Sequence, residues 1–154
     1  MMSAASNYLE LEVLDHVLGE GARNFTSPSA LHVALFAGTA SDVLTALESG
    51  TNSTSGTGNW GHYEITTGSY ARQAVNFATA SSGSAASNST VTFPVATANY
   101  NNTATSGATV TCIAVVDAST AGNVLFFGEL TTSKTVSSGD QFTVSSGNLT
   151  VSLA

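Results

Sequence analysis

The chain has 154 residues, a net charge of −7, and three basic residues against ten acidic ones. So few basic residues leave no surface for binding phosphates, which excludes nucleic-acid binding by this chain alone. Charged residues make up 8% and hydrophobic residues 42% of the sequence, which argues against disorder and favours one folded domain. Ser, Thr, Gly and Asn dominate the remainder, so we expect hydroxyl-covered faces, which cost less to bury against a neighbouring subunit than ions do.

The sequence pattern predicts no membrane-spanning helix, no signal peptide and no intramolecular disulfide. No apolar run approaches the about 18 residues of a membrane helix, so no membrane partner is expected. Residues 1–7 contain no basic stretch that leads into an apolar one, so we expect no signal peptide. The single cysteine, Cys112, excludes an intramolecular disulfide and lies in an apolar run, where a buried, inert thiol is the usual outcome.

Residues 7–18 carry the clearest helical pattern. Apolar side chains recur there at helical spacing and form one stripe: Tyr8, Leu11, Leu14 and Leu18. Asn7 and Glu10 resemble a capping box, and Gly19 or Gly21 can end the helix. A helix this short is not stable alone in water, so the stripe must pack on the chain's own sheet or on a neighbouring subunit. The four residues are therefore a predicted assembly interface. Residues 42–47 are compatible with a short helical turn.

From residue 22 onward the pattern changes to short strands. Apolar residues alternate over 31–36, 70–77 and 149–153, which indicates strands with one buried face. Residues 110–117 are apolar on both faces and are the best candidate for a central strand. Residues 124–127 are expected to pair back on it as a hairpin.

The strands and turns together predict the fold class and the domain organisation. Seven to eight strands at turn spacings of roughly 8–12 residues indicate a mainly β fold, an antiparallel β-sandwich or small, jelly-roll-like barrel with one N-terminal α-helix. Residues 1–21 form an N-terminal arm and amphipathic helix, and residues 22–154 form a single β domain. Long polar loops are expected near 49–59, 81–89 and 99–107.

Arg72 is a basic residue inside an apolar-patterned segment. A guanidinium there is costly unless a carboxylate or several carbonyls receive its five donors. Glu64 lies just upstream, so the sequence predicts a structural ion pair between Arg72 and Glu64. A ligand-binding arginine is the alternative.

Trp60, His62 and Tyr63 directly follow the polar loop at 49–59. Because aromatic side chains anchor interfaces, this segment is a possible contact loop. The alternative is that Trp60 closes one end of the barrel or sandwich.

The sequence predicts no catalytic, cofactor-binding or metal-binding residues. His16, His32 and His62 lack metal-site spacing, and no nucleophile elbow, P-loop or dinucleotide fingerprint is present. A carboxylate pair for glycoside hydrolysis stays open, because its members can be remote in sequence. We therefore expect a protein that is not an enzyme and needs no cofactor.

A set of separated stretches runs in order along nearly the whole chain: 14–19, 31–36, 68–77, 88–94, 122–126, 130–136 and 139–151. Together they resemble a family of small tailed-phage virion proteins described as tail-fibre-like. The resemblance implies a virion structural protein made in the cytoplasm of a bacterial host. Its expected partners are other virion proteins, of the tail or the major capsid protein, and further copies of itself, with a trimer among the candidate states.

Two classes of function follow from these patterns and from the resemblance. The first is a non-enzymatic virion structural protein, either a tail-fibre-like, tail-associated subunit or a capsid decoration (cement) subunit. The alternative is a carbohydrate-binding host-attachment adhesin that uses Trp60 and Tyr63 as a stacking platform. A hydrolytic depolymerase is a third possibility.

Overall fold

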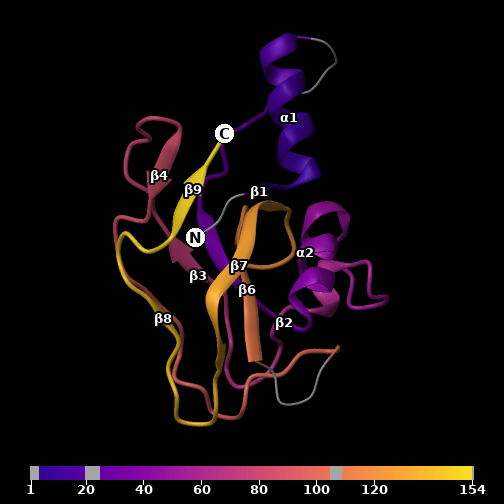
Figure 1. Ribbon diagram of the computed structural model, residues 1–154, viewed down its shortest axis with the longest axis vertical. Helices are drawn as coiled ribbons and strands as arrows, with labels where there is room; N and C mark the ends of the chain where they lie inside the picture. The colour runs from indigo at the N-terminus through magenta and orange to yellow at the C-terminus, as the bar shows by residue number, and fades with distance from the viewer. Residues whose placement is uncertain (1–3, 20–24, 105–108, 154) are drawn as a thin grey trace.

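The structure, a computed structural model, describes residues 4–19, 25–104 and 109–153. Its centre is a five-stranded antiparallel sheet. In spatial order, the strands are β1 (Ala4–Ala5), β7 (Val124–Thr135), β6 (Thr109–Val116), β2 (Leu31–Ala37) and β3 (Gln73–Val75). β1 and β3 are the two edges, so the sheet does not close into a barrel (Figure 1).

Two small antiparallel sheets and a helix cover the central sheet. β4 (Ser84–Ala86) pairs with β9 (Thr150–Ser152), and β5 (Val91–Thr92) pairs with β8 (Thr143–Val144). Figure 1 shows both pairs on one side of the central sheet and α2 (Ala40–Ser49) on the other. The predicted mainly β, antiparallel class is confirmed, in a layered, sandwich-like arrangement.

β6 is the middle strand, as its two apolar faces predicted. It lies between β7 and β2, and from Cys112 to Val116 its residues are at most 1% exposed. Ala114 of β6 pairs with Ala34 of β2 on one side and with Phe127 of β7 on the other. These two pairings of β6 are the longest in the sheet. The expected hairpin with the segment at 124–127 is also confirmed.

The structure differs from the sequence expectation in two elements. The prediction of a single helix was incomplete, because residues 40–49 form a full helix. Its buried residues are Val43, Ala46 and Leu47. Because a helix of this length is marginal on its own, the packing of these residues on the sheet stabilises α2 more than the helix propensity of its sequence does. The predicted loop at 81–89 contains β4, which is built from small residues without an apolar pattern and is held by its pairing with β9.

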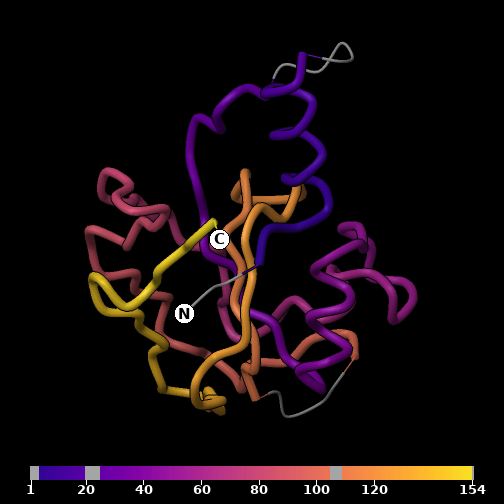
Figure 2. Tube along the Cα trace, turned by 45° about the horizontal axis from the view of Figure 1, so that its top comes forward, coloured from indigo at the N-terminus to yellow at the C-terminus, as the bar shows by residue number. Residues whose placement is uncertain are grey.

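Helix α1 (Asn7–Leu18) has the predicted bounds but begins with a different cap. Ser6, not Asn7, is the N-cap, and its hydroxyl accepts a hydrogen bond from the Leu9 N–H at 3.3 Å. Gly19 ends the helix in the left-handed conformation, with φ of 69°. Figures 1 and 2 show α1 projecting beyond the end of the sheet.

The central position of Cys112 leads to a testable prediction. Its side chain is 0% exposed, and burial raises the pKa of the thiol to about 11. Because the thiolate is the reactive form, iodoacetamide at about pH 8 should label the folded protein at least about 100-fold more slowly than the chain in denaturant. Mass spectrometry of the two samples measures this, and equal rates would contradict the buried position.

The same shift has a consequence for stability at high pH. The folded thiol keeps its proton to a higher pH than the unfolded thiol, whose pKa is near 9.0. The stabilisation is therefore fully present below about pH 9 and is lost as the pH rises toward 11.

Candidate functional site

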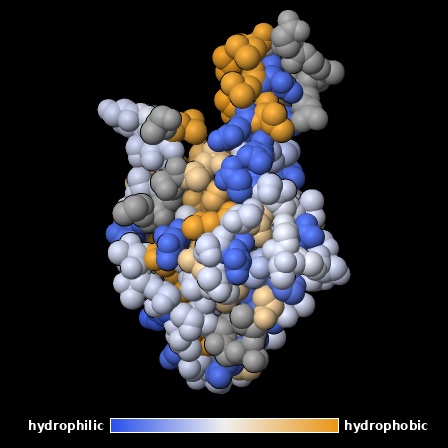
Figure 3. Space-filling view, turned by 45° about the vertical axis from the view of Figure 1, so that its right-hand side comes forward, coloured by the Kyte–Doolittle hydropathy of each residue, from blue (hydrophilic) through white to orange (hydrophobic). Residues whose placement is uncertain are grey.

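Exposed apolar side chains gather on α1. Among the described residues, the large exposed hydrophobic side chains outside this helix are Val95 and Leu153. On α1 they form a surface that we call the α1 stripe: Tyr8, Leu11, Leu14, Val17 and Leu18. Their exposed fractions run from 37% for Tyr8 to 73% for Val17, and Figure 3 shows the hydrophobic atoms on the projecting helix. Across the described residues, the predicted stripe is thus exposed rather than packed on the sheet.

The side of α1 that faces the protein is held by other residues. Leu9 is 5% exposed and is the fully buried side chain of the helix. The Ser6 backbone N–H donates to the Leu125 carbonyl at 3.0 Å, and the Ser6 hydroxyl donates to the Val124 carbonyl. These bonds fix the first turn of α1 to β7. The sequence stripe missed Val17, although its i+3 spacing from Leu14 was the available signal.

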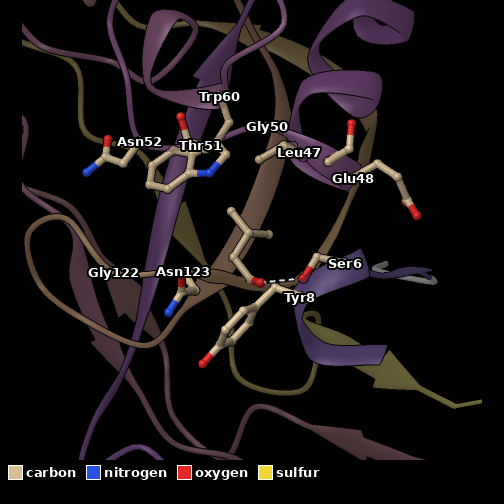
Figure 4. A pocket seen from close by; sticks show the side chains of 12 residues that line it. Ser6, Tyr8, Leu47, Glu48, Gly50, Thr51, Asn52, Trp60, Gly122 and Asn123 are labelled. Carbon is tan, nitrogen blue, oxygen red and sulfur yellow. Dashed lines mark hydrogen bonds between the residues drawn. The ribbon is translucent and has the colours of Figure 1, made fainter. Parts of the chain in front are cut away.

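A small polar cavity of about 260 Å³ lies where the base of α1 meets the end of α2. Figure 4 shows Tyr8, Glu48, Asn52 and Asn123 around it, with Trp60 on one side. Partial burial raises the pKa of Glu48, and the charge of Glu10 adds to the effect. Hydroxyl, amide and carboxylate side chains line the cavity, so it can both donate and accept hydrogen bonds.

The structure brings Arg72 and Glu64 together in a two-pronged ion pair. Arg72 Nε donates to Glu64 Oε1 and Nη2 donates to Oε2, both at 2.7 Å. Nη1 donates to the carbonyls of Ala118 at 3.0 Å and Ala121 at 2.7 Å. The Arg72 side chain is 4% exposed and that of Glu64 is 11% exposed. With four donors taken inside the chain, the guanidinium clamps the turn at 118–121 against the sheet.

Tyr70 connects this pair to the central sheet. Its hydroxyl donates to Glu64 Oε1 at 3.0 Å and accepts from the Leu35 N–H at 3.1 Å. Burial and the neighbouring Glu64 charge raise the pKa of Tyr70 well above its ordinary value. Burial also disfavours the charged form of Arg72, but the hydrogen bonds and charge of Glu64 outweigh it, so the pKa of Arg72 is raised. Near neutral pH Arg72 therefore stays charged and Tyr70 stays neutral.

The aromatic residues of the possible contact loop lie in the core. Trp60 is 2% exposed and meets Phe36 edge to face at 6.3 Å, with the Arg72 guanidinium 5.4 Å from its ring centre. Tyr63 is 5% exposed, and His62 is half-buried beside it with ring centres 5.1 Å apart. Neither Trp60 nor Tyr63 presents an open ring face, so the structure does not provide the stacking platform that an adhesin on these residues requires.

Two negative findings concern the described residues. Within the ranges 4–19, 25–104 and 109–153, no three His, Cys, Asp or Glu side chains lie close enough to hold a metal ion. In the same part of the chain, no helix has both the length and the apolar character needed to cross a membrane.

A layered β body with a projecting apolar helix is typical of a subunit that contacts other proteins in a larger assembly. The chain belongs to the family of the podophage GP4 fiber I protein gp80, whose model matches residues 4–152. No curated protein matches the chain. The resemblance to small tailed-phage fibre-like proteins is therefore confirmed, and the protein is a phage virion structural component.

Breaking the Arg72–Glu64 pair should destabilise the fold. Arg72→Met leaves a buried carboxylate without its partner, so we expect the free energy of unfolding to fall by about 3–5 kcal/mol. Urea unfolding measures this loss. The double variant Arg72→Met/Glu64→Gln should lose less than the sum of the two single variants, because the second change removes the unpaired charge.

Lys134 provides the matched control for this prediction. It is a basic residue on an exposed part of β7. Lys134→Met should change the unfolding free energy by no more than about 0.5 kcal/mol. A loss below about 1 kcal/mol for Arg72→Met would contradict the clamp.

Proposed function

We propose that this chain is a non-enzymatic, tail-associated fibre subunit that the phage particle holds through the α1 stripe. The observation that carries the proposal is the exposure of Leu11, Leu14 and Leu18 on a helix that projects from the body. Large apolar side chains gathered on one element mark a protein interaction site.

The stripe offers enough apolar surface to offset the lower estimates for the cost of association, and contacts beyond the stripe must supply the remaining affinity. Burying a large apolar side chain completely contributes about 1.5–3 kcal/mol, so side chains that are about half exposed contribute roughly 1 kcal/mol each. The five residues of the stripe therefore supply on the order of 5 kcal/mol, which is comparable with the lower estimates for the cost of association. The bonds from Ser6 to β7 hold the first turn in place before binding, which lowers that cost.

The family supports a fibre position over a place on the capsid. Its description names a fiber protein, and a structural fibre component needs no catalytic residues. A capsid decoration subunit remains the alternative position. Quantitative mass spectrometry of purified particles separates the two, because a decoration subunit is present at about one copy per major capsid protein whereas a tail fibre subunit is far less abundant.

The buried aromatic rings count against the adhesin alternative. Trp60 and Tyr63 were its proposed sugar platform, and both are enclosed by the core. A glycan array provides the direct test, since Trp60-dependent binding to a host polysaccharide would favour the adhesin.

A substitution in the α1 stripe tests the proposal. Leu14 is 54% exposed, so Leu14→Asp should leave a folded chain, with a circular dichroism spectrum like the wild type. The new charge makes burial of the stripe against a partner costly. In phage grown with the variant gene, we expect its copy number per particle to fall to less than about a tenth of the wild-type value.

Val95 is the matched control for Leu14. It is 51% exposed and lies outside α1. Val95→Asp should enter particles at the wild-type copy number. Equal incorporation of a folded Leu14→Asp chain would overturn attachment through α1.

A further inference from the structure

A hollow of about 480 Å³ lies between α2 and β7, and none of the residues of the α1 stripe lines it. α2 packs against β7, and Figure 1 shows the two elements side by side. Ala4, Leu44 and Phe127 give the hollow apolar walls, and Glu48 and Glu129 each bring a carboxylate to it. Its volume is within the roughly 300–1,000 Å³ that is usual for ligand pockets. We call it the α2–β7 hollow.

Both elements present an apolar side chain and a carboxylate on the same side. Leu44 and Glu48 are four residues apart on α2, so they lie on one face of the helix. Phe127 and Glu129 are two residues apart on β7, so they lie on one face of the sheet. The hollow is therefore suited to a side chain that combines an apolar stem with a cationic end.

The two carboxylates of the hollow have no partner of opposite charge in the described part of the chain. Within that part, neither Glu48 nor Glu129 has a hydrogen bond or an ion pair from its carboxylate to a donor. Partial burial raises the pKa of Glu48, and the charge of Glu10 adds to the effect. A cation that entered the hollow would relieve this repulsion and would favour the ionised form of the carboxyl group.

We propose that the α2–β7 hollow binds a lysine side chain of a different virion protein. The aliphatic stem of the lysine lies against Ala4, Leu44 and Phe127, and its ammonium group donates hydrogen bonds to the carboxylates of Glu48 and Glu129. The inference deepens the proposed function by giving the chemistry of the partner. It rests on that function for the presence of this partner in the particle.

Charge favours a different protein over a second copy. This chain has ten acidic residues and three basic ones, so two copies repel each other. Arg72 is occupied by Glu64, and Lys134, the one lysine of the sequence, does not line the hollow. Arg23 lies outside the described residues. A positively charged partner supplies the charge that this surface lacks.

The arrangement of the carboxylates favours lysine over arginine. Glu48 and Glu129 come from two elements, α2 and β7. An ammonium group is compact and directs its three donors to separate acceptors. A guanidinium matches both oxygens of one carboxylate, as Arg72 does with Glu64.

Zero-length cross-linking of purified particles tests the proposed contact directly. A carbodiimide activates a carboxylate, and a lysine amine that touches it then forms an amide bond. We expect mass spectrometry to find a peptide with Glu48 or Glu129 joined to a lysine of another virion protein. Because Lys134 is the one lysine of this chain, any other linked lysine must belong to a different protein.

A charge-removing variant measures how much the contact holds the subunit in place. Glu48→Gln/Glu129→Gln keeps the shape of both side chains, so its circular dichroism spectrum should match the wild type. Its dissociation rate from particles, followed by quantitative mass spectrometry after dilution, should rise at least about tenfold. Asp42→Asn is the matched control, because Asp42 is an exposed acid of α2 that does not line the hollow. It should dissociate at the wild-type rate.

Several outcomes would overturn the inference. Cross-links from Glu48 or Glu129 to Lys134 alone would place a copy of this chain in the hollow. Faster dissociation of the double variant without any cross-link to lysine would mean that another donor occupies the hollow, and an unchanged dissociation rate would mean that the hollow takes no part in attachment.

The proposed attachment through α1 fails or stands separately. If Leu14→Asp is lost from particles while the double variant dissociates at the wild-type rate, the α1 stripe holds the subunit and the inference about the hollow is wrong. If Leu14→Asp is incorporated normally while the double variant dissociates faster and the cross-link is found, the hollow holds the subunit and attachment through α1 is wrong.

Discussion

The buried pair of Arg72 and Glu64 is the contact on which the irregular half of the molecule depends. The chain between α2 and β3 contains one short 3-10 helix and little other regular structure, so hydrogen bonds from side chains must hold it in place. Glu64 receives two bonds from Arg72 and one from Tyr70, while Arg72 also holds the turn before β7. Because Tyr70 accepts from the Leu35 backbone, the network joins this segment to β2. A charge pair so well bonded within the core specifies one arrangement of the segments around it, whatever its net contribution to stability.

Elements whose apolar residues recur at regular spacing could be predicted from the sequence. Elements that are held by strand pairing or by side-chain hydrogen bonds could not. The bounds of α1 and the central place of β6 follow from spacing and from apolar character on both faces. β4 has no such pattern, because Ser84–Ala86 are small residues whose strand exists through pairing with β9. The segment at 70–77 alternates like a strand, but its first half bends away because Tyr70 and Arg72 are bonded to Glu64, and only Gln73–Val75 pair with β2.

The candidate site was predictable to a similar degree. The stripe was visible as helical spacing, but its exposure depends on how Ser6 and Leu9 seat the helix, which spacing does not show. The aromatic segment at 60–63 was ambiguous, because a Trp after a polar loop occurs both at contact surfaces and at the ends of cores. In the structure Trp60 is 2% exposed, with the Arg72 guanidinium 5.4 Å from its ring centre, and only the fold brings those two residues together. The two apolar hollows that Leu153 lines beside α1 had no signal in the sequence, since β9, β4 and α1 are far apart along the chain.

Under the proposed function, the contrast between α1 and the body limits association of unassembled copies. Exposed faces built from Ser and Thr carry few charges, so the net charge of −7 is the main source of repulsion between unassembled copies. Three of the ten acidic residues, Glu10, Glu12 and Asp15, lie on α1 among the apolar side chains. Acidic charge is therefore concentrated beside the α1 stripe, and under the proposed attachment through this helix, association depends on close apolar fit rather than on long-range attraction. Because Ser6 fixes the first turn of α1 and Leu153 lies beside the helix, that fit is presented by a surface already in place.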